Sequence, residues 1–322
     1  MAVPISVRHL SFTYMPNTPM AVRALSDVSF DVDDGEFVAI IGPTGSGKST
    51  LIQHLNGLIR PRPATVFVDG QDVGDRRTDL RKLRLQVGLV FQYPEYQLFE
   101  ETVYADIAFG PRSAGLSPEE VDRRVRRSME LVGLRPAEFA RRSPFELSGG
   151  QRRRAAIAGV LALGCSKLIL DEPTAGLDPG GRRELLRLLS RLNRSGMTIV
   201  LVTHNMDEVA QVAERALVLS AGRIAVDAPV RELFARHRKL LEEHHLSIPA
   251  AVRILHELHA RGADVRLDRL TVDEVAGEIA RWWKGRATRN GATGGARRAP
   301  GLSPEGRAAG AHGDHPRAVR PR

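Results

Sequence analysis

One stretch decides the fold: Gly42-Pro43-Thr44-Gly45-Ser46-Gly47-Lys48-Ser49. It fits the phosphate-loop pattern G-x-x-x-x-G-K-[ST], and it directly follows Glu36–Ile41, whose short apolar run predicts a buried strand. Glycines let the backbone approach a phosphate, so that several N–H groups point inward. A helix is expected from after Gly47 to about Leu55, and its N-terminus adds partial positive charge. A Gly/Ser-rich turn is the alternative, but the strand–loop–helix setting favours a nucleotide-phosphate site.

The side chains at the end of this loop suit a magnesium nucleotide. Lys48 can reach the β- and γ-phosphates, and the Ser49 hydroxyl is a suitable ligand for Mg²⁺. Thr50 is expected near the α-phosphate. Mg²⁺ also needs a carboxylate, and hydrolysis needs a group that orients or deprotonates water.

Both requirements are met after a second buried strand, Leu168–Leu170. Asp171 is predicted to hold the Mg²⁺ shell, and Glu172 to act as general base toward the attacking water. Two acids after an apolar strand are weak evidence alone, but the phosphate loop strengthens them. His204 follows a third strand candidate, Thr198–Thr203, at the sheet edge where α/β folds bind ligands. We therefore expect His204 to contact the γ-phosphate.

Strand-like and helical runs alternate along the rest of the chain. Strands are predicted at Ser6–Tyr14, Ala24–Val32 and Thr65–Asp69. A helix should begin at Pro118, with Ser117 as its cap and Glu120 reaching back to it. The leucines of residues 185–192 predict an amphipathic helix. Two short helices, Pro249–Arg261 and Val272–Trp283, form a C-terminal appendage. The pattern is typical of an α/β fold with a largely parallel sheet.

The net charge is concentrated in one segment. The chain has 322 residues and a formal charge of +9. Residues 285–322 hold eight arginines against two acids, which is +6, and leave +3 for the remainder. Twenty of these 38 residues are Gly, Ala or Pro, so the segment is interpreted as a disordered basic tail. The charge gives little reason to expect a nucleic-acid partner, although contact of the tail with RNA or anionic lipid stays an alternative.

Cysteine content and hydropathy suggest a soluble protein. Cys165 is the single cysteine, and it is expected to be a buried structural thiol. The apolar run that it ends, from Ala155, is too short for a bilayer, and Met1–Leu10 has no features of a leader. We expect any membrane role to come through a partner.

Three further motifs carry a family resemblance. They are Leu147-Ser148-Gly149-Gly150-Gln151, Gln92 within Val90–Pro94, and Ala175-Gly176-Leu177-Asp178. With the phosphate loop, the two acids and His204, the chain resembles an ABC-transporter ATP-binding subunit over about residues 4–235. The resemblance implies a P-loop ATPase fold with a β-rich N-terminal subdomain, a parallel-sheet core and a helical signature subdomain at about 95–165. ATP and Mg²⁺ are the implied cofactors.

The resemblance also assigns roles. Tyr14 would stack on adenine, although Phe12 is close, and Gln92 would sense the γ-phosphate and Mg²⁺. Asp178 would cross the interface of a head-to-tail ATPase dimer. The γ-phosphate of the opposite subunit would be bound by the signature residues Ser148, Gly149 and Gly150, and Gln151 would belong to the same nucleotide-binding set. The second ATPase would be a copy of this chain or a paralogue. Ala64 stands where the family usually has glycine, which leaves the conformation of that turn open.

A finer resemblance lies in Phe91–Val103 and Asp106–Pro111. These segments are similar to ATPases of energy-coupling factor (ECF) transporters, closest to the second of the two paired subunits. The resemblance implies domains at 1–235 and 236–284, the latter a dimer-holding extension. It implies a transmembrane coupling subunit near Gln92, a substrate-binding membrane subunit, and uptake of a vitamin or of cobalt or nickel ions. The implied location is the cytoplasmic face of the membrane.

Other classes fit less well. The ATPase of another ABC transporter differs only in its partners and stays open. An ABC ATPase acting on ribosomes or nucleic acid is disfavoured by the single uninterrupted cassette. A non-hydrolysing module conflicts with Glu172 and His204, and the guanine-reading string of a GTPase is absent from the sequence.

Overall fold

Two sheets form the framework of the ATPase unit. The computed structural model describes residues 4–292. An antiparallel sheet has the order β2-β1-β4-β5, built from Val22–Val32, Ile5–Tyr14, Val66–Val68 and Gln71–Asp72. A six-stranded sheet has the order β10-β9-β3-β8-β7-β6, built from Arg223–Pro229, Arg215–Ser220, Phe37–Ile41, Thr198–Val202, Lys167–Asp171 and Val87–Val90. Its strands are parallel except for β10. The predicted α/β fold is confirmed.

The central strands are apolar because both faces of their sheet are covered. β3 and β8 are buried at every position. On one face, Val38 and Ile40 pack in the cluster that contains the antiparallel sheet and α1 (Lys48–Leu55). On the other face, Ile41 packs against α8 (Met206–Val212). Phe37 packs in the core that also contains the helical subdomain described below. Alternate residues of one strand therefore hold together separate layers.

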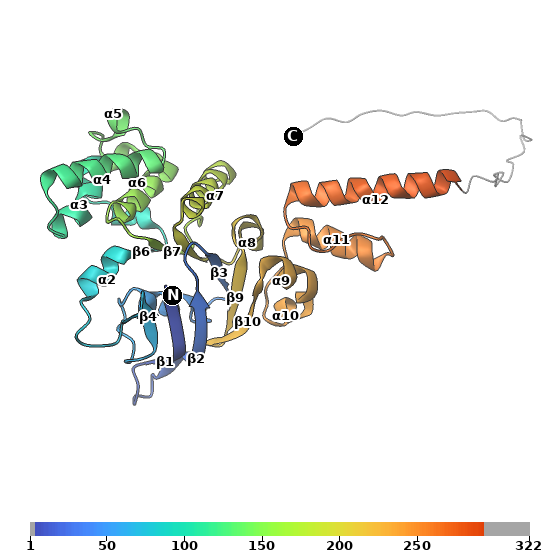
Figure 1. Cartoon of the computed structure of the whole chain (residues 1–322), viewed down its shortest axis with the longest axis horizontal. Coiled ribbons are helices and arrows are strands. Elements are labelled where there is room, and N and C mark those ends of the chain that lie inside the picture. The colour runs from blue at the N-terminus through green and yellow to red at the C-terminus, as the bar shows by residue number, and fades with distance from the viewer. Residues whose placement is uncertain (1–3, 293–322) are drawn as a thin grey trace, which may run out of the picture. The chain divides into compact units, whose positions relative to one another are not determined.

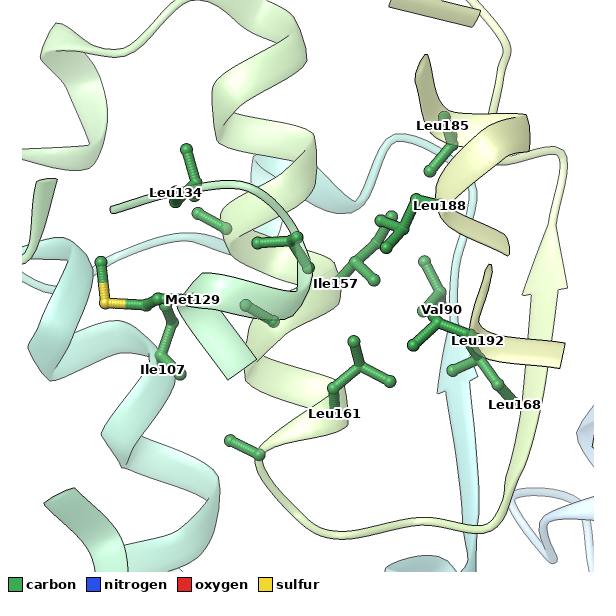
Figure 2. Packing of buried hydrophobic residues seen from close by; sticks show 14 of the residues in the cluster. Val90, Ile107, Met129, Leu134, Ile157, Leu161, Leu168, Leu185, Leu188 and Leu192 are labelled. Atoms are coloured by element: carbon green, nitrogen blue, oxygen red, sulfur yellow. The ribbon is translucent and has the colours of Figure 1, made fainter. Parts of the chain in front are cut away.

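The helical subdomain lies beside β6 and β7 (Figure 1). Its elements are η1 (Pro94–Gln97), α3 (Val103–Ser113), α4 (Pro118–Leu131), α5 (Pro136–Phe139), η2 (Pro144–Glu146) and α6 (Gly149–Leu161). Figure 2 shows Ile107, Met129 and Ile157 of this subdomain in the same cluster as Leu168 of β7 and Leu188. The subdomain therefore has no separate core, and its packing continues onto the sheet that carries the acidic residues.

Two further helices complete the ATPase unit. They are α2 (Leu80–Gln86) and α7 (Pro179–Arg194). The leucine pattern predicted α7, and Leu185, Leu188 and Leu192 are all buried. At α4, Ser117 caps the helix as expected by accepting from the Glu120 N–H. The reach-back by Glu120 is wrong, because its carboxylate pairs instead with Arg123 and Arg124.

The C-terminal extension has more helix than expected. α9 (Val230–Arg236) lies at the end of the ATPase domain, and α10 (Arg238–Glu243) comes before the two predicted helices of the extension. The predicted pair are α11 (Ala250–Ala260) and α12 (Val272–Ala292). α12 runs past residue 284, so the expected start of the tail at 285 is wrong, because no proline interrupts the sequence before Pro300. The rest of that tail, 293–322, lies outside the described residues. In the described part, no helix is long and apolar enough to cross a membrane.

Candidate nucleotide-binding and catalytic site

A cleft of about 450 Å³ lies where the phosphate loop, the β1–β2 hairpin and the end of β7 meet. Ten of the predicted site residues line it: Tyr14, Thr44, Gly45, Gly47, Lys48, Ser49, Thr50, Gln92, Asp171 and Glu172. Sequence reasoning missed its other three lining residues, Val22, Arg23 and Ala24. The hairpin register places Val22 opposite Tyr14. The start of the strand that follows Tyr14 could therefore have been predicted to lie beside the same nucleotide.

Two glycines make the phosphate loop possible. Gly42 has φ +156°, and a Cβ there would lie 2.1 Å from the Leu219 carbonyl oxygen. Gly47 has φ +103°, and its Cβ would lie 2.4 Å from the Ala24 carbonyl oxygen. Any side chain at either position would displace backbone. The loop therefore reaches its conformation only because both positions lack a Cβ.

Lys48 is held inside this loop. Its buried ammonium donates to the carbonyl oxygens of Gly42 at 2.8 Å and Pro43 at 2.9 Å. Burial lowers the pKa of Lys48, while the carboxylates of Glu172 and Asp171 oppose that shift. The charge is thus presented on a fixed stem at the cleft, where an anionic phosphate would compensate it.

Asp171 and Ser49 offer oxygen ligands side by side. Burial raises the pKa of Asp171, and a hydrogen bond from the Ser49 hydroxyl counters part of that rise. A hydroxyl, a carboxylate and the nearby Gln92 amide form a hard oxygen donor set, which suits Mg²⁺ better than softer metals. The donor chemistry present therefore fits the predicted ion.

The three catalytic candidates form one hydrogen-bonded group. The Gln92 side-chain amide donates to Glu172 Oε2 at 3.2 Å, and His204 Nδ1 lies 3.0 Å from Glu172 Oε1. Glu172 has φ +45°, an uncommon backbone conformation for a residue with a side chain. His204 does not line the cleft itself, and it reaches the site through Glu172.

Tyr14 is the aromatic residue that faces the cleft. Its hydroxyl shares a hydrogen bond with Thr50 Oγ1 at 3.1 Å, and its side chain lines the cavity. Phe12 instead packs against the core between Tyr14 and His54, with ring centroids 4.8 Å from each. This placement favours Tyr14 over Phe12 as the ring that could stack on the adenine of a nucleotide.

The signature residues and Asp178 do not line the cleft. Ser148 and Gln151 form a capping box at the start of α6, with hydrogen bonds of 3.3 and 2.9 Å. A Cβ at Gly149 or Gly150 would meet no atom within 4 Å, so both backbones face open space. Asp178 caps α7 by accepting from the Gly180 and Gly181 N–H groups, which lower its pKa. Both helix N-termini are therefore built and ordered without a contact to this cleft.

One buried arginine of the signature helix was not predicted. Arg153 is 2% exposed and pairs with both carboxylate oxygens of Glu95. It also donates to the carbonyl oxygens of Pro173, at 2.7 Å, and Ala175, at 2.6 Å. It thereby joins α6 to the segments that follow Gln92 and Glu172. Arg153 lies two residues after the signature, and the sequence there does not distinguish it from the neighbouring Arg152 and Arg154.

Comparison with known proteins places this geometry in a family. A family model described as ABC transporter matches residues 25–175. The ECF transporter ATP-binding protein EcfA2 of Symbiobacterium thermophilum is 56% identical over 277 residues, covering 86% of this chain and 96% of that protein. EcfA2 of Caldanaerobacter subterraneus subsp. tengcongensis is 50% identical over 284 residues, covering 88% and 99%.

Solved structures agree with this placement. CbiO1 of Clostridium perfringens, part of the ABC transporter complex CbiONQ, has a TM-score of 0.67 and 34% identity. It covers 80% of this chain and all of its own. The dimeric ATP-binding cassette MJ0796, bound to ADP and Pi after hydrolysis, has a TM-score of 0.62 and 30% identity over 70% of this chain and 98% of its own. The chain therefore belongs to the ECF transporter ATP-binding proteins, a family of ABC ATPases.

Proposed function

We propose that this chain binds and hydrolyses ATP as a subunit of an ECF-type importer, with Glu172 as the general base. The observation that carries this proposal is the hydrogen-bonded group of Gln92, Glu172 and His204 at the cleft that also holds Lys48. A carboxylate fixed by two polar neighbours at a phosphate-binding cleft is placed to accept a proton from water.

Each of the other side chains would then bind a different part of the nucleotide. Tyr14 stacks on adenine, Lys48 binds the β- and γ-phosphates, and Thr50 lies toward the α-phosphate. Ser49, Asp171 and Gln92 would hold Mg²⁺, which neutralises phosphate charge when bound. His204, which is hydrogen-bonded to Glu172, would contact the γ-phosphate. Of the remaining loop residues, Gly42 and those from Thr44 to Gly47 supply backbone N–H groups, whereas Pro43 has none to donate.

The proposed membrane partner docks beside Gln92. Four large aromatic side chains of this region are exposed: Tyr93, Tyr96, Phe99 and Phe109. They form two ring pairs: Tyr93 and Tyr96 are tilted, with centroids 6.0 Å apart, and Phe99 and Phe109 meet edge to face, with centroids 5.1 Å apart. Such an apolar surface on a protein marks an interaction site, and we assign it to a transmembrane coupling subunit. The ATPase then lies at the cytoplasmic face of the membrane.

A different subunit determines which solute is transported. We propose that a separate membrane subunit binds a vitamin or a transition-metal ion, while this chain supplies the energy. A second ATPase, a copy or a paralogue, completes each ATP site with its Ser148–Gln151 segment and its Asp178. Residues 1–284 carry a net charge of only +3, and we expect no nucleic-acid partner.

The catalytic assignment is tested by Glu172→Gln. This variant is expected to bind ATP with unchanged affinity in titration calorimetry and to hydrolyse it at least about 100-fold more slowly, because the amide cannot accept the proton. Glu130→Gln, an exposed acid on α4, serves as the matched control and should retain full turnover. Near-normal hydrolysis by Glu172→Gln would refute the assignment.

The transporter assignment is tested by co-purification. An affinity-tagged full chain, extracted from membranes with mild detergent, should retain a transmembrane coupling protein and a second ATPase. Replacing exposed Tyr96 and Phe99 by serine should release the membrane protein while ATP binding persists. Retention of the membrane protein by that double variant would contradict the docking surface.

A further inference from the structure

One buried carboxylate contacts both loops that carry the catalytic pair. Glu208, on α8, is 2% exposed. Its two oxygens accept from the Thr174 hydroxyl at 2.8 and 2.9 Å, and one also accepts from the Thr203 hydroxyl at 3.0 Å. The Asn205 amide donates to it at 3.2 Å. The glutamate therefore connects three segments through hydrogen bonds.

The two threonines are neighbours of the catalytic residues in sequence. Thr174 follows Glu172 by two positions, and Thr203 directly precedes His204. The Thr203 hydroxyl also accepts from the Asn205 N–H at 3.1 Å, which fixes its hydrogen toward Glu208. A shift of Glu208 would therefore move one or both loops.

Stability alone does not explain a carboxylate at this place. Burying it removes its hydration, and among residues 4–292 a single cation pairs with it: Arg182, whose Nε lies 3.4 Å away on a side chain that is 41% exposed. Glu172 also adopts a strained φ of +45°, which persists only where the surroundings fix it. The Glu208 network supplies such surroundings, together with the hydrogen bond from the Glu172 N–H to the Val202 carbonyl at 2.9 Å.

We propose that Glu208 is a positioning residue for hydrolysis: it holds Thr174 and Thr203 so that the Glu172 carboxylate and the His204 imidazole keep their contact at the γ-phosphate. This inference rests on the proposed function, since it assumes that Glu172 and His204 act in catalysis. Glu208 itself touches neither ATP nor water in this scheme. It acts by setting the distance between two loops.

The helix that carries Glu208 is anchored by the C-terminal extension. Asp207, its neighbour, accepts from the Ala250 N–H at 3.0 Å, at the start of α11. Met206 and Val209 pack in one cluster with Leu246 and Val252. α8 therefore has fixed contacts with both the extension and the catalytic loops. A helix anchored in this way can hold the two loops at a fixed distance.

Steady-state hydrolysis by the full chain tests the proposal. Glu208→Gln keeps the shape of the side chain but cannot accept all the same donors. It should lower kcat by about 10- to 100-fold, the usual cost of slightly misplaced groups, while KM for ATP changes less than about twofold. Glu278→Gln is the matched control, since Glu278 is also 2% exposed but pairs with Arg266 and Arg281 in the extension. Its kcat should be unchanged.

Two further variants keep the test decisive if Glu208→Gln does not fold. Thr174→Val and Thr203→Val each remove one hydrogen bond with little change in shape, and each should lower kcat without raising KM. Combined with Glu208→Gln, their effects should be less than multiplicative, because all three disrupt one network. Unchanged kcat in both threonine variants, or a rise in KM alone, would overturn the proposal.

Glu172→Gln, measured in parallel, separates this inference from the proposed function. If Glu172→Gln hydrolyses ATP normally, the proposed function fails. If it is inactive while Glu208→Gln and the threonine variants have normal kcat, only the positioning role fails.

Discussion

At the residue scale, the catalytic candidates differ in how their backbones are held. Among Gln92, Glu172 and His204, Glu172 alone has a positive φ, which costs about 1–3 kcal/mol in such regions. The surrounding hydrogen bonds must supply that energy. This is why Gln is the informative replacement for Glu172: it keeps the side-chain shape, whereas a smaller residue would also remove contacts that support the strained backbone.

His54 makes the stability of this chain sensitive to acid. The ring is fully buried, its Nδ1 is hydrogen-bonded to the Thr50 carbonyl at 2.7 Å, and its Nε2 has no hydrogen-bond partner among the described residues. Burial lowers the pKa of His54 below 6.5, and the Thr50 carbonyl opposes this only in part. Below pH 6.5 the unfolded chain therefore binds a proton that the folded chain resists. The free energy of unfolding should fall as pH drops, by at most about 1.4 kcal/mol per pH unit from this group.

The measurement is urea unfolding at several pH values between 7.5 and 5.5. His54→Asn keeps a donor near the Nδ1 position but does not titrate, so its curve should have a shallower pH dependence. His259→Asn, an exposed histidine of α11, should match the unmodified chain. An equal pH dependence in all three proteins would refute the role of His54.

At the element scale, one turn forms despite an unfavourable residue. Ala64 has φ +62°, a left-handed conformation that glycine adopts without strain. Two hydrogen bonds compensate: the Ala64 N–H donates to Asp72 at 2.7 Å, and the Thr65 hydroxyl donates to the Arg62 carbonyl at 2.6 Å. The turn before β4 is therefore retained by its neighbours.

Ala64→Gly should stabilise the fold. Relief of left-handed strain is worth about 1–2 kcal/mol and exceeds the entropy that glycine adds to the unfolded chain, so a net gain of about 0.5–1 kcal/mol is expected. The control is Ala114→Gly, at the end of α3, where φ is −78° and glycine should destabilise. Urea unfolding measures both changes in stability, because a shift of the midpoint at an unchanged m-value reports a change in the free energy of unfolding. A loss of stability in Ala64→Gly would contradict the strain argument.

Local elements and motifs were predictable from sequence, and long-range pairings were not. β3 and α1 follow from a short apolar run and a glycine-rich loop, whose signals lie within twenty residues. Arg153 and Glu208 gave no such signal, because Glu95, which pairs with Arg153, and Thr174, which pairs with Glu208, lie 58 and 34 residues away and only the fold brings them together. The end of α12 was missed because glycine weakens a helix without necessarily ending it, and arginine is a good helix former.

At the scale of the whole molecule, the site is divided between two surfaces. The cleft holds the phosphate loop and the acids, while Ser148, Gly149 and Asp178 lie at two helix N-termini outside it. A helix N-terminus favours an anion, and a partner's γ-phosphate would provide one. A head-to-tail pair of ATPases would place these termini against the partner's ATP, so ATP itself should drive the pairing.

Glu172→Gln makes this pairing measurable, since ATP that is bound but not hydrolysed should hold the two ATPases together. Light scattering after size exclusion should show a doubled mass for the affinity-purified variant in MgATP and a single-chain mass in MgADP. The pairing involves this chain with itself or with the second ATPase that co-purifies. Adding Ser148→Arg should restore the single-chain mass in MgATP, because the bulky side chain blocks the N-terminus of α6. Ser113→Arg, at the exposed end of α3, should leave the doubled mass intact. A single-chain mass for Glu172→Gln in MgATP would contradict the shared site, and so would a doubled mass that Ser148→Arg does not reduce.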